Sequence, residues 1–355
     1  MSTTRPNLLI PIAAFVIIVA GMRAASGLFV PFLLSVFIAV ISFPLLDWLH
    51  ERGIPRWLAL LIVIFGVASV GLAMSMVVNS SISDFSESLP GYQAKLRDQT
   101  GTLLTWLSNH GIKLPRDGLQ SMFDPAASIG LASRLLLSIN SMLSNAFLIL
   151  LTVSFILLEA WNIPEKLKIA LPDSNRSLQY MGNLSANVRK YIGIKAIVSL
   201  ATGVVIGLWL LVLGIDFALL WGLLACLLNF VPTVGSIIAG VPAVLLALIQ
   251  GGPGLAAATA AGYLATNLVM GNIIEPKVMG RGLGLSALVI FLSLIFWGWV
   301  FGPIGMLLSV PLTMIAKVAL EAGESTRWMA IMMGASNEVI AESADEEPID
   351  HALEK

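Results

Sequence analysis

The sequence predicts an all-α polytopic membrane protein with about eight transmembrane helices. Hydrophobic residues make up 57% of the 355 residues and charged residues only 12%, and the mean hydropathy is +0.90. A soluble core of this size does not need so much apolar surface. Stretches that reach or approach the roughly 20 helical residues needed to cross a bilayer recur along the chain: residues 8–22, 27–49, 57–79, 135–159, 192–214, 255–272 and 303–322.

The distribution of Lys and Arg predicts the orientation of these helices. Arg23 stands where a secretory cleavage site needs a small residue, so we expect the first helix to be retained. When the N-terminus is placed inside, Arg23 is the only basic residue in the short outer segments, whereas the inner segments hold many. We therefore expect both termini on the cytoplasmic side of the membrane.

The polar segment 80–134 is patterned as a helical hairpin outside the cytoplasm. Apolar side chains recur at helical spacing and predict an amphipathic helix over 88–109: Leu89, Tyr92, Leu96, Leu103 and Leu107. Asp124-Pro125 is typical of a helix start and leads into the next span. The hairpin either packs against itself or a sister subunit, or it gates the substrate.

The pattern divides the chain into five parts. These are N-terminal transmembrane helices in 1–79, the extracytoplasmic segment 80–134, transmembrane helices in 135–214 with a basic cytoplasmic linker at 160–191, a transport core in 215–322 and a cytoplasmic tail in 323–355. A helix that begins near Asp173 or Ser174 is expected to continue into the 192–214 span.

Two short apolar segments, 217–249 and 285–312, are interrupted by glycine and proline in the same way. The crossing count requires 217–249 to begin and end outside, either as two crossings or as a re-entrant hairpin, and its short arms favour the hairpin. If 285–312 is also a hairpin, the two enter from opposite faces, as in the inverted repeats of secondary transporters. The alternative is that Gly and Pro are simply common in membrane helices.

Interrupted helices leave backbone N–H and C=O groups free to hold a polar substrate near the middle of the membrane. The candidate substrate-binding residues are Asn229, Val231, Pro232, Gly235, Asn267, Asn272, Gly302, Pro303 and Gly305. The two asparagines within the span, at 267 and 272, could equally join neighbouring helices.

The candidate coupling or gating residues are Glu275, Lys277 and Arg281. Glu275 either forms a local ion pair with the two basic residues or binds a proton or a cation. Lys195 lies only a few residues inside its span and is expected to extend its amine back to the inner surface.

The residue inventory also excludes several classes of function. One cysteine, Cys226, rules out an intramolecular disulfide or a cysteine metal cluster. The sequence has no phosphate-binding loop, no nucleophile elbow and no basic patch for nucleic acid. We therefore expect neither an enzyme nor a metal or cofactor.

Three stretches closely resemble the bacterial autoinducer-2 exporter family and its PerM-like superfamily: PFLLSVFIAVISFPLLDWL, LLNFVPTVGSIIAGVP and NLVMGNIIEPKVMGRGLGLSALVIFLSLIFWGWVFGPIGMLLSVPLT. The resemblance covers nearly the whole chain and is least clear in 80–134 and the tail. It implies an all-helical inner-membrane protein, usually counted as eight spans. It also implies outward movement of the quorum-sensing signal autoinducer-2 and a homo-oligomer, expected to be a pentamer.

Three functions stay open at this point. The first is secondary transport that exports autoinducer-2 or a similar small hydrophilic metabolite. The second is sodium or lithium/proton antiport, because other members of the superfamily are described as antiporters. The third is a membrane scaffold or regulator that transports nothing.

Overall fold

The computed structural model describes residues 9–109, 145–163, 165–166, 175–232, 234–279, 284–321, 323 and 326–334. Within these ranges every regular element is a helix. Four helices there are long and apolar enough to cross a membrane, and shorter apolar helices accompany them: Ser26–Glu51, Arg56–Phe85, Val188–Val212 and Val234–Met279. The predicted all-α polytopic membrane fold is confirmed. Asp124-Pro125, Arg281 and the tail beyond 334 lie outside the described residues.

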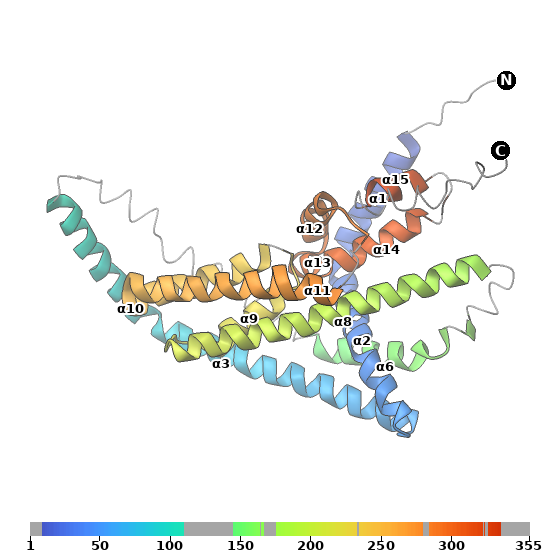
Figure 1. The fold of residues 1–355 in the computed structure, drawn as a ribbon, viewed down its shortest axis with the longest axis horizontal. Helices are drawn as coiled ribbons and strands as arrows, with labels where there is room; N and C mark the ends of the chain where they lie inside the picture. The colour runs from blue at the N-terminus through green and yellow to red at the C-terminus, as the bar shows by residue number, and fades with distance from the viewer. Residues whose placement is uncertain are drawn as a thin grey trace, which may run out of the picture. The chain divides into compact units, whose positions relative to one another are not determined.

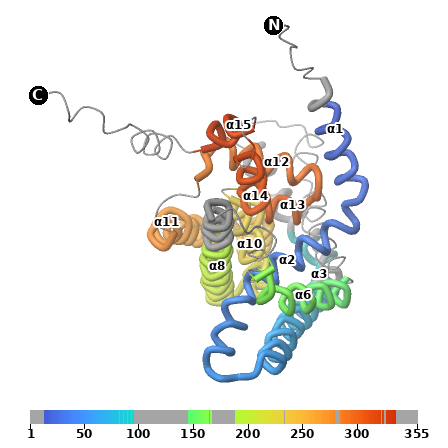
Figure 2. The backbone as a smooth tube through the Cα atoms, turned by 90° about the vertical axis from the view of Figure 1, so that its right-hand side faces the viewer, coloured from blue at the N-terminus to red at the C-terminus, as the bar shows by residue number. Residues whose placement is uncertain are grey.

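The helices belong to two compact units that interleave along the chain (Figures 1 and 2). Unit 1 consists of Met1–Pro44, Thr152–Gly193 and Met279–Lys355, and unit 2 of Leu45–Leu151 and Ile194–Val278. Four described helices have a part in each unit: α2 (Ser26–Glu51), α6 (Ala146–Ala160), α8 (Asn175–Val212) and α11 (Glu275–Met279). The five-part division made from the sequence stays a prediction.

In unit 2, α3 (Arg56–Asn109) is one continuous helix of 54 residues. The sequence suggested a span at 57–79 and a separate amphipathic helix at 88–109, but the helix passes through Pro90 without ending. Phe85 and Tyr92 are buried, whereas Lys95 is exposed. The amphipathic segment therefore extends a transmembrane helix and packs against the unit by one side.

Unit 2 also contains a helical hairpin, at the place where the sequence predicts a re-entrant one. Its first arm is α9 (Ala218–Leu228), whose 11 residues span only about 16 Å of a roughly 30 Å hydrocarbon core. Its second arm is the first part of α10 (Val234–Val269). The start of the first arm and the end of the second arm lie close together, because the Asp216 N–H donates to Gln250 Oε1 at 3.3 Å. Of the two geometries that the crossing count allowed for 217–249, the short first arm favours the re-entrant hairpin, which stays a prediction.

The long helix α10 is itself divided into two antiparallel arms. Gly252 breaks it with φ 75° and ψ −166°, a conformation that suits glycine. A Cβ at Gly240, in the first arm, would lie 3.3 Å from the ring of Tyr263 in the second. The second arm continues through a π-helical turn, η1 (Met270–Ile274), into the short α11 (Glu275–Met279). Figure 1 shows the two arms side by side.

Unit 1 contains a second helical hairpin. Its arms are α12 (Ala287–Phe301) and α14 (Ser309–Glu321), and its tip holds Gly302 and the short α13 (Pro303–Leu307). Trp297 Nε1 donates to Thr313 Oγ1 at 3.0 Å between the arms. At the open end, Lys317 Nζ donates to the Gly284 carbonyl at 2.7 Å. The stretch 303–322, read from the sequence as one span, is therefore divided near Leu308.

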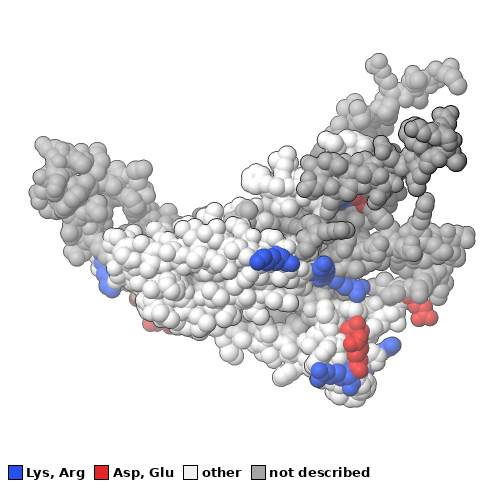
Figure 3. Space-filling model, viewed as in Figure 1, with Lys and Arg blue, Asp and Glu red and all other residues white. Residues whose placement is uncertain are grey.

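The described residues on the face shown in Figure 3 carry few charged side chains. The surface over α10 and α8 is a wide uncharged area, with the charged side chains of that area near its ends. Such a belt is what a bilayer requires of the helices it surrounds, because charged side chains are costly in hydrocarbon.

Candidate polar site in the re-entrant hairpin of unit 2

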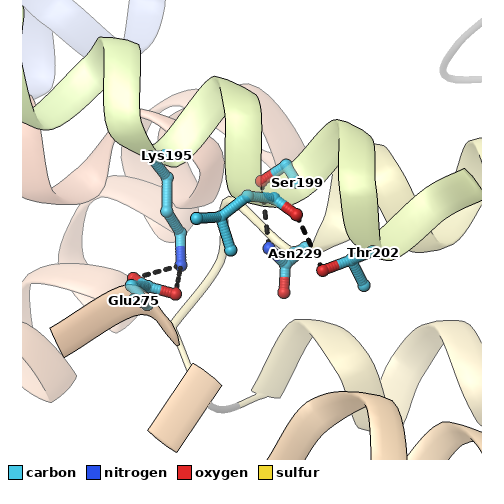
Figure 4. A network of polar contacts seen from close by, with 6 residues as sticks. Lys195, Ser199, Thr202, Asn229 and Glu275 are labelled. Atoms are coloured by element: carbon cyan, nitrogen blue, oxygen red, sulfur yellow. Dashed lines mark hydrogen bonds and ion pairs between the residues drawn. The ribbon is translucent and has the colours of Figure 1, made fainter. Parts of the chain in front are cut away.

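A stripe of polar residues on α8 faces the hairpin of unit 2. Lys195, Ser199 and Thr202 follow the spacing i, i+4 and i+7, which places them on one side of a helix. All three are at least 95% buried. Thr202 donates to the Val198 carbonyl in its own helix at 2.8 Å, whereas the other two bond to side chains from other elements. Figure 4 shows the stripe pointing toward the hairpin and α11.

Glycines allow α9 to pack directly on α8. A Cβ on Gly203 would lie 2.7 Å from the carbonyl oxygen of Gly222, and one on Gly222 would lie 2.8 Å from that of Gly203. Small residues at such a crossing let helix backbones approach closely in a membrane. The close approach brings Asn229, which follows α9, to Ser199: its Nδ2 donates to Ser199 Oγ at 3.0 Å.

One turn from this hydrogen bond lies a buried ion pair. Lys195 Nζ is 2.7 Å from Glu275 Oε1 and 2.8 Å from Oε2. The side chain of Lys195 is 6% exposed and that of Glu275 is 17% exposed. A pair removed from water to this degree must stay paired, because an uncompensated buried charge is costly.

The polar contacts lie well inside the apolar part of α8, Val188–Val212. Ser199 is 11 residues from one end of that part and 13 from the other, or about 16 Å and about 20 Å along the helix. The Asn229–Ser199 hydrogen bond is thus near the middle of the span, and Lys195 is nearer one end. Polar groups at that depth are typical of a functional site.

The described residues of the first predicted tip are closely packed. Asn229, Val231 and Gly235 are buried, and Pro232 is half-buried. A Cβ on Gly235 would lie 1.8 Å from the carbonyl oxygen of Leu228, so only glycine fits there. Of the predicted residues, Asn229 contacts α8 at Ser199 and Glu275 contacts it at Lys195, one helical turn away.

The second predicted tip has the same construction within its own unit. Gly302 adopts φ 68° and ψ −149°, Pro303 opens α13, and Gly305 is buried. A Cβ on Gly305 would lie 1.9 Å from the carbonyl oxygen of Trp297. The two tip glycines therefore make the same contact, each pressed against a carbonyl of the incoming arm, as the shared sequence pattern suggested.

The remaining predicted residues lie away from these contacts or outside the described part. Asn267 is half-buried, and Asn272 is exposed in the π-helical turn. Lys277 is exposed and two residues from Glu275. Among the described residues, Glu275 forms its ion pair with Lys195 and not with Lys277. The Lys195 amine is buried against the Glu275 carboxylate, and the expectation that it extends toward the inner surface stays a prediction.

Sequence reasoning missed Lys195, Ser199 and Thr202 as site residues. The signal was present as polar residues at helical spacing in an apolar span. Their partners, however, are 30 residues away for Ser199 and 80 residues away for Lys195, and local patterns do not reveal such pairings.

The profile of the AI-2E family transporters matches residues 12–325. The chain belongs to the AI-2E transporter family. It is 38% identical over 331 residues to the AI-2 transport protein TqsA of Escherichia coli strain K12, an alignment that covers 93% of this chain and 96% of that protein. It is 40% identical over 332 residues to a protein of Haemophilus influenzae strain Rd, covering 92% and 95%, and 33% identical over 339 residues to YhhT of Escherichia coli strain K12, covering 94% and 97%.

Membership in the AI-2E family, together with the apolar helices, makes this chain a multi-pass membrane transporter. The family resemblance noted in the sequence is confirmed over nearly the whole chain. The names of the Haemophilus protein and of YhhT refer to transport without a substrate. The polar cluster on α8 is therefore a candidate site for transport within an AI-2E protein.

Proposed function

We propose that this AI-2E transporter exports autoinducer-2, or a similar small hydrophilic metabolite, across the bacterial inner membrane. The observation that carries the proposal is the hydrogen bond of the buried Asn229 amide, at the tip of the hairpin, to Ser199 near the middle of the apolar part of α8. The similarity to TqsA, which is named as an AI-2 transport protein, supports the choice of cargo.

The tip offers the groups that a polyhydroxylated ligand needs. The described backbone N–H groups of the tip donate within the turn and to the end of α9, as Val231 does to Leu228 and Gly235 does to Val231, so the proposed ligand contacts there are the side chains. Asn229 and Ser199 add side-chain donors and acceptors. Asn267 and Asn272, and the second tip at Gly302, Pro303 and Gly305, stay in the proposal as predicted substrate contacts.

The proposed cargo site can be tested by measuring the transport of labelled autoinducer-2 into vesicles that contain the reconstituted protein. Asn229→Ala should raise the half-saturating concentration about fivefold or more, since one hydrogen bond contributes about 1 kcal/mol. Asn79→Ala is the matched control, because Asn79 is exposed on α3. Unchanged transport by the Asn229→Ala variant would show that the first tip does not belong to the site. Unchanged transport by the Asn267→Ala and Asn272→Ala variants would show that the second arm of α10 and the turn after it do not belong to the site.

A second candidate function is exchange of sodium or lithium for protons. The buried Lys195–Glu275 pair favours it, because ionisable groups inside a span mark ion pathways. In vesicles loaded at one pH and diluted into another, cation movement should follow the pH difference. Glu275→Gln should abolish that movement, and normal exchange by this variant would rule out the role of Glu275.

We also propose that the protein is a homo-oligomer, expected to be a pentamer, with both termini in the cytoplasm. Native mass spectrometry of protein released from detergent micelles checks the first part. A monomer at all detergent ratios would contradict it.

A further inference from the structure

The hydroxyl of Tyr263, in the second arm of α10, is buried without a partner. The residue is 8% exposed, and among the described residues nothing forms a hydrogen bond with its hydroxyl oxygen. The buried Tyr92, by contrast, donates its hydroxyl to Asp216. Buried tyrosine hydroxyls are usually hydrogen-bonded, and one that is not costs free energy that a phenylalanine would not cost. Packing alone therefore does not account for a tyrosine at position 263.

The polar groups that flank Tyr263 on its own arm already have partners. Thr259, one turn before it, donates to the carbonyl four residues earlier at 2.9 Å. Trp209 of α8 donates to another carbonyl of this arm at 3.2 Å. On the side of the first arm, the ring of Tyr263 lies against Gly240, where a Cβ would be 3.3 Å from it. The hydroxyl is thus left unpaired within the apolar core of unit 2.

Tyr263 lies near the middle of the apolar stretch 255–272. It is eight residues from the start of that stretch and nine from its end, or about 12 Å and about 14 Å along a helix. Gly240, against which it packs, is five residues beyond Gly235 of the tip, or about 7 Å. The unpaired hydroxyl therefore belongs to the contact between the second arm of α10 and the hairpin that carries Asn229.

The surroundings of this hydroxyl favour an uncharged ligand. No residue from Phe217 to Ile274 carries a charge, and the charges of Lys195 and Glu275 neutralise each other. A charged ligand would lose its water there without gaining a counter-ion, which is costly. A ligand with uncharged hydroxyl groups loses only hydrogen bonds, and a tyrosine hydroxyl can replace one of them because it both donates and accepts.

An unpaired buried hydroxyl recurs in the hairpin of unit 1. Ser309, the first residue of α14, is fully buried, and its hydroxyl also has no hydrogen-bond partner among the described residues. It stands two residues before Pro311, as Gly240 stands two residues before Pro242. Each hairpin thus has an unpaired hydroxyl at this place, on Ser309 itself and on the tyrosine that covers Gly240. A chance packing fault would have no reason to recur there.

We propose that the Tyr263 hydroxyl binds a hydroxyl group of the cargo, and that the cargo is uncharged and polyhydroxylated. The cargo reaches Tyr263 when the two arms of α10 part at Gly240, where the first arm has no side chain against the ring. The hydroxyl then gains the hydrogen bond that it lacks within the protein. The proposal rests on the export function proposed above and adds Tyr263 to the residues of its site.

The Tyr263→Phe variant loses the hydroxyl and keeps the ring. In vesicles, its half-saturating concentration of labelled autoinducer-2 should be at least about fivefold higher than that of wild type, since one hydrogen bond to the cargo is lost. Its unfolding temperature in detergent without cargo should be equal or higher, because the hydroxyl has no protein partner to lose. A lower unfolding temperature with an unchanged half-saturating concentration would show that the hydroxyl only stabilises the fold, and would overturn the proposal.

Tyr92→Phe is the matched control, because it removes a buried hydroxyl that does have a partner, Asp216. This variant should show the opposite pair of results. Its unfolding temperature should fall, and its half-saturating concentration should stay within about twofold of wild type.

Competition for uptake checks the class of cargo. An excess of unlabelled ribitol, which is uncharged, should slow the uptake of labelled autoinducer-2 by wild type, whereas the same excess of ribitol phosphate should not. Uptake that ribitol does not slow, or that ribitol phosphate slows as strongly, would show that the proposed class is wrong.

The role of Tyr263 can fail while the export function stands. Wild-type vesicles that take up no labelled autoinducer-2 would contradict the export function and with it the role of Tyr263. Uptake that Asn229→Ala weakens and Tyr263→Phe leaves unchanged would keep that function and overturn the role of Tyr263 alone. Weaker binding without loss of stability in Tyr263→Phe is the expected result.

Discussion

Gly235 is fixed by a contact that no larger residue can make. A Cβ at this position would lie 1.8 Å from the Leu228 carbonyl oxygen and 2.7 Å from its carbon. Gly235→Ala should therefore displace the tip and destabilise the protein by about 1–3 kcal/mol, the usual cost of overpacking. Gly254→Ala is the control, because a Cβ there meets no atom within 4 Å. Thermal unfolding in detergent measures both, and equal midpoints for the two variants would contradict the contact.

Tyr92 is a residue whose protonation reports on its surroundings. Burial, followed by the hydrogen bond to Asp216 and the charge of that carboxylate, raises the pKa of Tyr92 to about 12 from an ordinary 10.0. Because the folded-state pKa is raised, the stabilisation from this phenol is complete below pH 10 and is lost as the pH rises through about 12. The tyrosinate absorbance of wild type minus that of Tyr92→Phe should show this midpoint. A midpoint near 10 would mean that the phenol does not reach Asp216.

At the scale of elements, three segments of unit 2 meet in one polar cluster. Tyr92 in α3 donates to Asp216 Oδ2 at 2.7 Å, and Gln250 at the end of the first arm of α10 donates to the same oxygen. Trp221 Nε1 donates to the Asp216 carbonyl at 3.1 Å. The cluster holds the open end of the hairpin of unit 2 against the extension of α3.

Removal of the shared acceptor should loosen that end of the hairpin. In the Asp216→Ala variant, the side chains of Tyr92 and Gln250 lose this acceptor. Backbone amides near 216 and 250 should therefore exchange hydrogen for deuterium at least about tenfold faster. A factor of ten corresponds to about 1.4 kcal/mol of opening free energy. Asp84→Ala, at an exposed position of α3, should leave that exchange unchanged. Mass spectrometry of the protein in lipid nanodiscs measures both, and protection that persists in Asp216→Ala would contradict the cluster.

Sequence patterns predicted individual helices better than the places where helices break. The continuous helix from near Asp173 into the 192–214 span was foreseen and is confirmed by α8, which starts at Asn175. Apolar periodicity extends over several turns, so it finds such helices. The break within 303–322 and the continuity of α3 through Pro90 depend on what packs against them, and periodicity carries no information on that.

At the scale of the whole molecule, only part of the candidate site could be predicted from the sequence. The tip residues Asn229 and Gly235 were found because glycine and proline interrupt an apolar run. The partners of the buried pair could not be found, because Lys195 and Glu275 are joined by the packing of α8 against the arms of α10 and not by spacing along the chain. Trp209 of α8, which donates to the Ala258 carbonyl at 3.2 Å, belongs to that packing.

The orientation of the chain in the membrane follows from charge and can be tested on one helix. Gly254, beside the turn between the arms of α10, and Lys277, in α11, are 23 residues apart, or about 34 Å along a helix, enough to cross a core of about 30 Å. Lys277 lies in a basic segment, so we expect it in the cytoplasm and Gly254 outside.

Single cysteines at these two exposed positions, in a Cys226→Ala background that removes the native thiol, decide the orientation. A membrane-impermeant maleimide added to intact cells should label Gly254→Cys, and it should label Lys277→Cys only after the inner membrane is opened. The reverse pattern would show that the protein has the opposite orientation. The Glu275 carboxylate would then be nearer the outside than the cytoplasm. Labelling of both in intact cells would mean that this arm of α10 does not cross, and the hairpin of unit 2 could not then be re-entrant from the outer face.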